Sequence, residues 1–328
     1  MMRIEPKKIM CAIDFSDFTN IILSYGKSLA SEFGSTLCLC HILSGTHMVS
    51  SLGHSYIHYP DIETERIQSA REMLEKMAKE IDIECEVIVS SGHVADEINQ
   101  IVLKNNIDMV IAATHGGSGI KRFLIGSVTD RLVKILKCPL LVLHAKEKHL
   151  TSVVEKNIKL KRILVGCDFS QDSSLAFDYA LSLAQEFQTQ LYLAHVIKPT
   201  QHIEMPASNY IKIQGGDYTN WALSEYMESQ KKADNEDLKN KKMLFRGLEK
   251  QLSSLVPEES RNWCTPITIL LEGQPYKELV DYAGQKKIDM IVLGVHGHSL
   301  LERFTVGSTT DRVISRASCP VLVVRESS

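Results

Sequence analysis

The sequence predicts an α/β protein built from two doubly wound domains, each with a five-stranded parallel sheet. Two observations predict this architecture. Apolar runs of strand length alternate with amphipathic helical segments along the chain, an order typical of parallel sheets with helices on both faces. The alternating pattern also occurs twice, and a chain of 328 residues is long enough for two ordinary domains.

The internal repeat follows from aligning the chain with itself. A shift of 154 places K-K-I-M-C-A-I-D-F-S at 7–16 on K-R-I-L-V-G-C-D-F-S at 161–170. Farther along the shift is 181, and it places R-F-L-I-G-S-V-T-D-R at 122–131 on R-F-T-V-G-S-T-T-D-R at 303–312. The change of shift indicates an insertion in the second copy.

The repeat also defines the expected domain limits. We expect a first domain at 1–146, a charged linker at 147–160 and a second domain at 161–328. The insertion lies near 200–245 and contains the charged run K-K-A-D-N-E-D-L-K-N-K-K, which favours a solvated helix extension.

Each element of the first copy follows from its residue pattern. Short apolar runs predict strands, and they occur at 9–13, 36–42, 84–89, 108–113 and 140–144. Apolar residues at helical spacing predict helices, and they occur at 17–33, 62–79, 94–104 and 128–136. Gly34 is expected to end the first helix.

Composition excludes several classes of protein. The formal charge of −3 argues against non-specific nucleic-acid binding, which requires clustered positive charge. No apolar run approaches the length of a membrane span, and the first residues lack the apolar core of a signal peptide. Cys38 and Cys40 alternate on one strand face, which favours core packing over metal binding, and no pair has C-x-x-C spacing. We therefore expect a cytoplasmic protein without membrane or nucleic-acid partners.

The loop after the fourth strand of the second copy has the features of an anion-binding site. The apolar strand stops at Gly294, and Gly297 follows in the loop before Gly307 and Ser308 begin a helix. Glycines let the backbone approach a ligand closely, and a helix N-terminus offers free N–H groups to phosphate. The spacing matches neither the P-loop nor the dinucleotide fingerprint.

Two features of each copy are expected to converge. The first strand ends near Asp14 or Asp168, and the fourth ends at Ala113 or Gly294. In doubly wound sheets, ligands bind beyond the carboxyl ends of the strands where the strand order reverses. If the strand order is 3-2-1-4-5, strands one and four flank that point.

These residues together resemble the universal stress protein family in its tandem two-domain form. The resemblance is carried by Asp-Phe-Ser at 14–16 and 168–170, by closing Cys-Pro pairs at 138–139 and 319–320, and by a glycine pattern. That pattern, G-x2-G-x9-G-[ST], is met in full by Gly294, Gly297, Gly307 and Ser308. The resemblance implies a Rossmann-like fold with the order 3-2-1-4-5 and pairing of the two domains through their last strands, as an intramolecular pseudo-dimer.

Members with the full glycine pattern bind ATP or a related adenine nucleotide, with or without Mg²⁺. The resemblance thus implies a nucleotide site in the second copy, at Asp168, Val196, Gly294, Gly297, Gly307, Ser308 and Thr309. A second, less favoured site in the first copy comprises Asp14, Ile42, Gly116, Gly126 and Ser127, because Ala113 replaces the first glycine there.

Structural alternatives remain for several of these side chains. Asp168 or Ser170 could cap the helix that follows, and Ser308 could be only a helix start. A structural role is also favoured for His195, whereas phosphate contacts of His296 and Arg303 are minority interpretations.

The resemblance favours an adenine-nucleotide-binding stress-response regulator over a dedicated enzyme. No catalytic residue is assigned, because no nucleophile and base pair is evident. No metal site is assigned either, since His47, His54, His58 and Asp61 are irregularly spaced. A slow ATPase or nucleotidyl-transfer enzyme and a ligand-free protein-interaction module remain as alternatives, and pairing of two chains as a homodimer also stays open.

Overall fold

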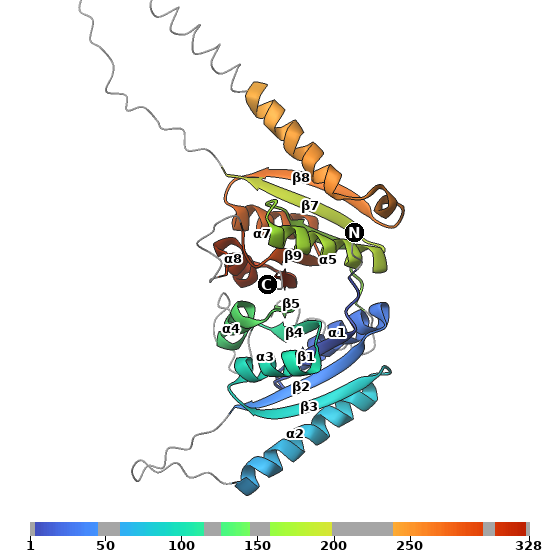
Figure 1. Ribbon diagram of the computed structural model, residues 1–328, viewed down its shortest axis with the longest axis vertical. Helices are drawn as coiled ribbons and strands as arrows, with labels where there is room; N and C mark the ends of the chain where they lie inside the picture. The colour runs from blue at the N-terminus through green and yellow to red at the C-terminus, as the bar shows by residue number, and fades with distance from the viewer. Residues whose placement is uncertain are drawn as a thin grey trace, which may run out of the picture.

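One ten-stranded sheet organises the protein, in the order β3-β2-β1-β4-β5-β10-β9-β6-β7-β8. The computed structural model describes residues 4–44, 60–114, 126–144, 158–198, 239–297 and 306–325. Counted from its own beginning, each half has the expected order 3-2-1-4-5. The expected parallel sheets are therefore present, but they join edge to edge into one mixed sheet, with the first half below and the second above in Figure 1.

The elements of the first half alternate as expected. Its strands are β1 (Lys8–Ala12), β2 (Thr36–Ser44), β3 (Cys85–Gly92), β4 (Met109–Ala113) and β5 (Leu140–Leu143). Its helices are α1 (Thr19–Phe33), α2 (Pro60–Glu80), α3 (Val94–Asn105) and α4 (Ser127–Ile135). Gly34 ends α1 in a left-handed conformation with φ of 65°, which confirms the expected glycine stop.

The second half repeats this order. Its strands are β6 (Arg162–Gly166), β7 (Gln190–Ile197), β8 (Thr265–Glu272), β9 (Met290–Gly294) and β10 (Val321–Val324). Its helices are α5 (Gln171–Glu186), α7 (Pro275–Lys286) and α8 (Ser308–Arg316), together with the short 3-10 helix η3 (Glu258–Asn262). A further helix over 239–255 precedes β8 and is exposed along most of its first half. None of the helices that the structure describes is long and apolar enough to cross a membrane.

The last strands of the two halves form the junction. β5 and β10 pair antiparallel, with Leu322 opposite Leu141, so the two apolar edges cover each other as expected. The segments that precede β1 and β6 add reciprocal contacts. The Ile4 N–H donates to Ser182 Oγ of α5 (3.1 Å), and the Ile158 N–H donates to Ser28 Oγ of α1 (2.8 Å). The halves are thus joined as a pseudo-symmetric pair.

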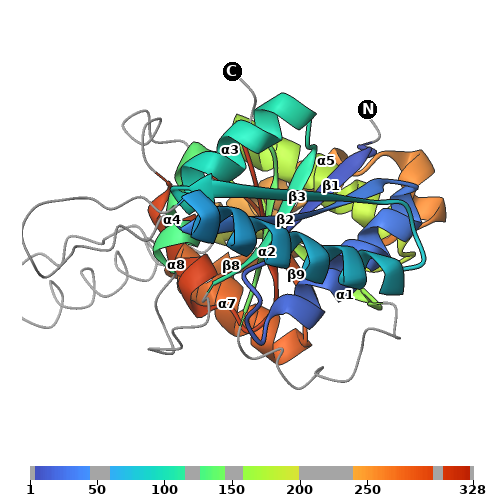
Figure 2. The same cartoon turned by 90° about the horizontal axis from the view of Figure 1, so that it is seen from below.

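Two apolar layers cover the sheet, and both continue across the junction. On one face, α1, α2, α5 and the 239–255 helix pack on side chains such as Ile9 and Val165. On the other face, α3, α4, α7 and α8 pack on side chains such as Met10 and Leu164. Cys38 and Cys40 lie in this second layer, which confirms their expected packing role. Figures 1 and 2 show the helices on either side of the sheet.

Candidate functional site

The Asp-Phe-Ser segment forms a tight turn directly after β6. The Oδ1 of Asp168 accepts the Ser170 N–H (2.9 Å). Ser170 in turn caps α5, since its hydroxyl oxygen accepts the Ser173 N–H (3.2 Å). The helix-capping role therefore falls to Ser170, and Asp168 instead closes the turn.

The central residue of this turn is held in an uncommon conformation. Phe169 has a φ of 65°, and its counterpart Phe15 in the first half has a φ of 57°. A bulky residue in the left-handed region carries strain, and such strain persists where the surrounding structure enforces it. His195 supports the turn, because its Nδ1 lies 2.7 Å from the Cys167 carbonyl oxygen and its ring centroid lies 4.9 Å from that of Phe169. Sequence reasoning missed this strain, since no residue-type rule predicts φ > 0 for phenylalanine.

The end of β7 exposes a backbone edge beside the same turn. β7 continues to Ile197, but its pairing with β6 stops at Ala194, whose carbonyl accepts the Cys167 N–H (2.8 Å). Backbone groups alternate sides along a strand. The N–H and C=O of Val196 therefore point to the same side as those of Ala194, into the space beyond the end of β6. Ile42 occupies the equivalent place in the first half, because the Cys40 carbonyl accepts the Ile13 N–H (2.8 Å).

The expected convergence of the first and fourth strands is confirmed. A Cβ placed on Gly297, in the loop after β9, would lie 2.8 Å from Asp168 Oδ2. The carboxylate thus rests against the glycine backbone, in a space that a larger residue would fill. Asp168 and Gly297 come from segments far apart in the sequence, and the parallel pairing of β6 with β9 brings them together.

Gly294 is required by the packing of α5. A Cβ at this position would lie 2.7 Å from both the carbonyl carbon and the Cβ of Asp172, in the first turn of α5. From the sequence, we expected the missing Cβ of Gly294 to let a phosphate approach the backbone. In the first half, where Ala113 carries a Cβ, α1 begins only at Thr19, which aligns with Ser173 rather than with the start of α5. The two halves therefore accommodate the two residues with different helix starts.

The N-terminus of α8 lies next in the loop and begins at Ser308, as expected. Gly307 precedes it, and its N–H donates to the Val295 carbonyl (2.8 Å). Thr310 anchors the first turn, since its hydroxyl donates to the Gly294 carbonyl (2.7 Å). No side chain in the described part of the chain caps α8. The N–H groups of the exposed Ser308 and the half-buried Thr309 are thus positioned to receive an anion.

The first half repeats this anchoring. The Gly126 N–H donates to the Thr114 carbonyl (2.6 Å), and the Thr129 hydroxyl donates to the Ala113 carbonyl (2.7 Å). Asp14 Oδ1 accepts the Ser16 N–H (3.0 Å), and Ser127 is exposed at the start of α4. Gly116 and Arg303 lie outside the described residues.

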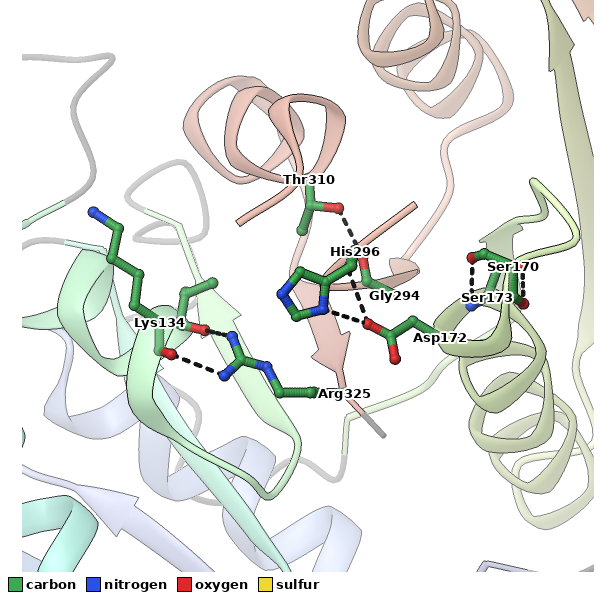
Figure 3. A network of polar contacts seen from close by, with 9 residues as sticks. Lys134, Ser170, Asp172, Ser173, Gly294, His296, Thr310 and Arg325 are labelled. Carbon is green, nitrogen blue, oxygen red and sulfur yellow. Dashed lines mark hydrogen bonds and ion pairs between the residues drawn. The ribbon is translucent and has the colours of Figure 1, made fainter. Parts of the chain in front are cut away.

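His296 forms a hydrogen-bonded contact with Asp172 that sequence reasoning missed. Asp172 Oδ2 accepts the backbone N–H of His296 (3.0 Å) and lies 2.8 Å from its Nδ1. The side chains are only 18% and 9% exposed, and Figure 3 shows them above Arg325. The available signal was a difference between the copies, because Phe18 stands where Asp172 would align.

Potential metal ligands were also sought among the described residues. Among the residues that the structure places, no three His, Cys, Asp or Glu side chains are grouped as metal ligands. The histidines of the segment 47–58 lie outside the described part. The converging groups instead offer backbone donors, one backbone acceptor and one carboxylate, a combination suited to a polar anionic ligand.

Comparison with known proteins identifies the family. The model of the universal stress protein family matches residues 5–144 and, a second time, 159–325. The chain belongs to the universal stress protein family. Its two matched segments correspond to the two halves of the sheet.

Individual relatives agree with this assignment. A universal stress protein of Methanocaldococcus jannaschii is 31% identical over 193 residues, which cover 58% of this chain and 98% of the relative. The universal stress protein E homolog of Haemophilus influenzae is 23% identical over 295 residues, which cover 85% and 82% of the two chains. A crystal structure of a universal stress protein from Archaeoglobus fulgidus has a TM-score of 0.61 at 20% identity, covers 97% of this chain and 96% of its own, and shows the same fold.

Proposed function

We propose that this universal stress protein is a cytoplasmic regulator that binds ATP or a related adenine nucleotide, mainly in its second half. One observation carries the proposal. The Asp168 carboxylate, the Val196 backbone and the start of α8, which no described side chain caps, all lie at the carboxyl ends of β6, β7 and β9. In doubly wound sheets this is where ligands bind.

Each part of the site matches a part of the nucleotide. The N–H and C=O of Val196 offer a donor and an acceptor to the edge of an adenine ring. Asp168 can accept hydrogen bonds from ribose hydroxyls, and Gly297 leaves the room that this carboxylate occupies. The N–H groups of Ser308 and Thr309, at the positive end of the α8 dipole, suit the phosphates.

A pair of matched variants tests the proposal. Gly307→Val places a branched side chain where the phosphates would lie, and Gly126→Val makes the same change in the first half. Both glycines are N-caps with extended backbone, at φ/ψ of −58°/136° and −62°/148°, so valine needs no left-handed conformation at either position. In calorimetric titration with ATP, Gly307→Val should weaken binding by on the order of tenfold or more, and Gly126→Val should change it little.

The outcomes separate the alternatives. Equal losses from the two substitutions, or two equivalent sites in the parent protein, would refute the preference for the second half. Absence of ATP binding in the parent would overturn the proposal and favour a ligand-free interaction module.

A further inference from the structure

The loop that follows β9, which begins with Val295, His296 and Gly297 and is called here the cradle loop, starts beside a contact between the two halves. β9 and β10 are parallel neighbours, and the Val295 N–H donates to the Val324 carbonyl at their ends (2.8 Å). This register places Arg325 beside Val295, the residue directly before His296. In the view of Figure 3, the Arg325 side chain is drawn below the His296 imidazole, and the Asp172 carboxylate to its right.

Arg325 reaches the helix α4 of the first half. Its Nη1 donates to the Lys134 carbonyl (2.8 Å) and its Nη2 to the Val133 carbonyl (3.1 Å). These carbonyls belong to the last turn of α4, where a cation is stabilised by the helix dipole. Burial lowers the pKa of the Arg325 guanidinium, and the Asp172 carboxylate opposes that shift, which indicates that the two charges interact.

In the reciprocal contact, from the first half to the second, no acidic residue stands at the position that aligns with Asp172. His144 aligns with Arg325, and its Nε2 lies 2.5 Å from the Ile314 carbonyl of α8. Phe18 aligns with Asp172 and has no charge to offer. The chain thus carries both contacts between the halves, and Asp172 has no acidic counterpart at the aligned position of the first half.

We propose that Asp172 is a positioning residue that couples the cradle loop of the second half to helix α4 of the first half, through His296 and Arg325. Asp172 fixes His296, the residue before Gly297, because its Oδ2 contacts both the backbone N–H and the Nδ1 of His296. The other end of α4, at Gly126 and Ser127, is the proposed phosphate end of the first site. A ligand in the second half should therefore be sensed at the first, and only this consequence rests on the proposed function.

Hydrogen exchange of the ligand-free protein tests the coupling directly. Asp172→Asn keeps the shape of the side chain but removes its charge, and it should speed exchange of the α4 amides, residues 127–135, by about threefold or more. Arg325→Leu should do the same, and the double variant should exchange no faster than Arg325→Leu alone. Lys134→Ala is the matched control: it keeps the carbonyl that Arg325 uses and removes only the exposed Lys134–Asp130 ion pair within α4, so it should change α4 exchange much less than Arg325→Leu.

A purely local role of Asp172 gives a different result. If Asp172→Asn speeds exchange only in α5 and in the segment around His296, with α4 unchanged, the coupling is wrong. Additive effects of Asp172→Asn and Arg325→Leu on α4 would equally overturn it.

A second experiment adds ATP and tests whether ligand occupancy in the second half is transmitted to α4. In the parent protein ATP should slow α4 exchange, and in Arg325→Leu it should not, with binding measured by calorimetry on the same samples. A parent protein that binds ATP without any change in α4 would refute transmission of ligand occupancy. If the parent binds no ATP but Asp172→Asn still loosens α4, the proposed function fails and the coupling stands.

Discussion

Substituting Gly294 by alanine tests the packing of α5 against the end of β9. The added Cβ would lie 2.7 Å from the Asp172 carbonyl carbon and 2.9 Å from its carbonyl oxygen. These are backbone atoms of a helix, so they cannot rotate away as a flexible side chain would. Forcing one extra carbon into a close-packed region costs about 1–3 kcal/mol. We expect Gly294→Ala to lower the free energy of unfolding by this amount, or the Tm by roughly 2–4 °C for each kcal/mol.

A second glycine in the same half provides a control of opposite sign. Gly284 lies in α7, and a Cβ there would meet nothing within 4 Å. Alanine at this exposed helical position should stabilise the protein by about 0.5–1 kcal/mol, because it restricts the unfolded chain. Guanidinium denaturation and thermal melts followed by circular dichroism would compare the two variants. Equal stability of Gly294→Ala and the parent protein would refute the packing argument.

Three further predictions concern the proposed site and the buried thiols. Gly297→Ala should weaken ATP binding by roughly tenfold in calorimetry with little change in Tm, because the Asp168 carboxylate can swing away; a large loss of Tm would contradict this. Turnover of ATP, measured by phosphate release, should stay well below about 1 s⁻¹, since the cradle has no P-loop lysine, and faster turnover would contradict the regulator role. Burial raises the pKa of Cys85 to about 11. At pH 8 its thiol should therefore react with a disulfide reagent far more slowly in the folded protein than in guanidinium. The rate in the folded protein should increase as the pH rises toward that pKa. Equal labelling rates in the two states would refute the last of these.

Much of the fold could be predicted from local patterns. Apolar runs and helical periodicity depend on neighbours in the chain, so the alternation of strands and helices was visible in the sequence. The stop of α1 at Gly34 was visible for the same reason, because the left-handed conformation at φ of 65° favours glycine. The repeat then extended each inference from one half to the other.

The sites were predicted only in outline. Asp168 and Gly297 could be named from their motifs, and their convergence followed from the expected strand order. The packing that requires a glycine at position 294 of β9 could not be foreseen. The atoms that exclude a Cβ there belong to Asp172, in helix α5, which is far away in the sequence. The left-handed Phe169 was equally hidden, because the turn around it, and not its own residue type, imposes that conformation.

The sequence by itself determined the class of fold, the duplication and the family. These three features depend on residue order and on short motifs, which can be recognised in the sequence alone. Only the tertiary structure decided which groups meet at a distance: the register of β5 against β10, the Asp172–His296 contact, and the hydrogen bonds from Arg325 to α4. Such contacts join residues more than a hundred positions apart, and their distances depend on how the helices pack on the sheet, which local sequence patterns do not encode.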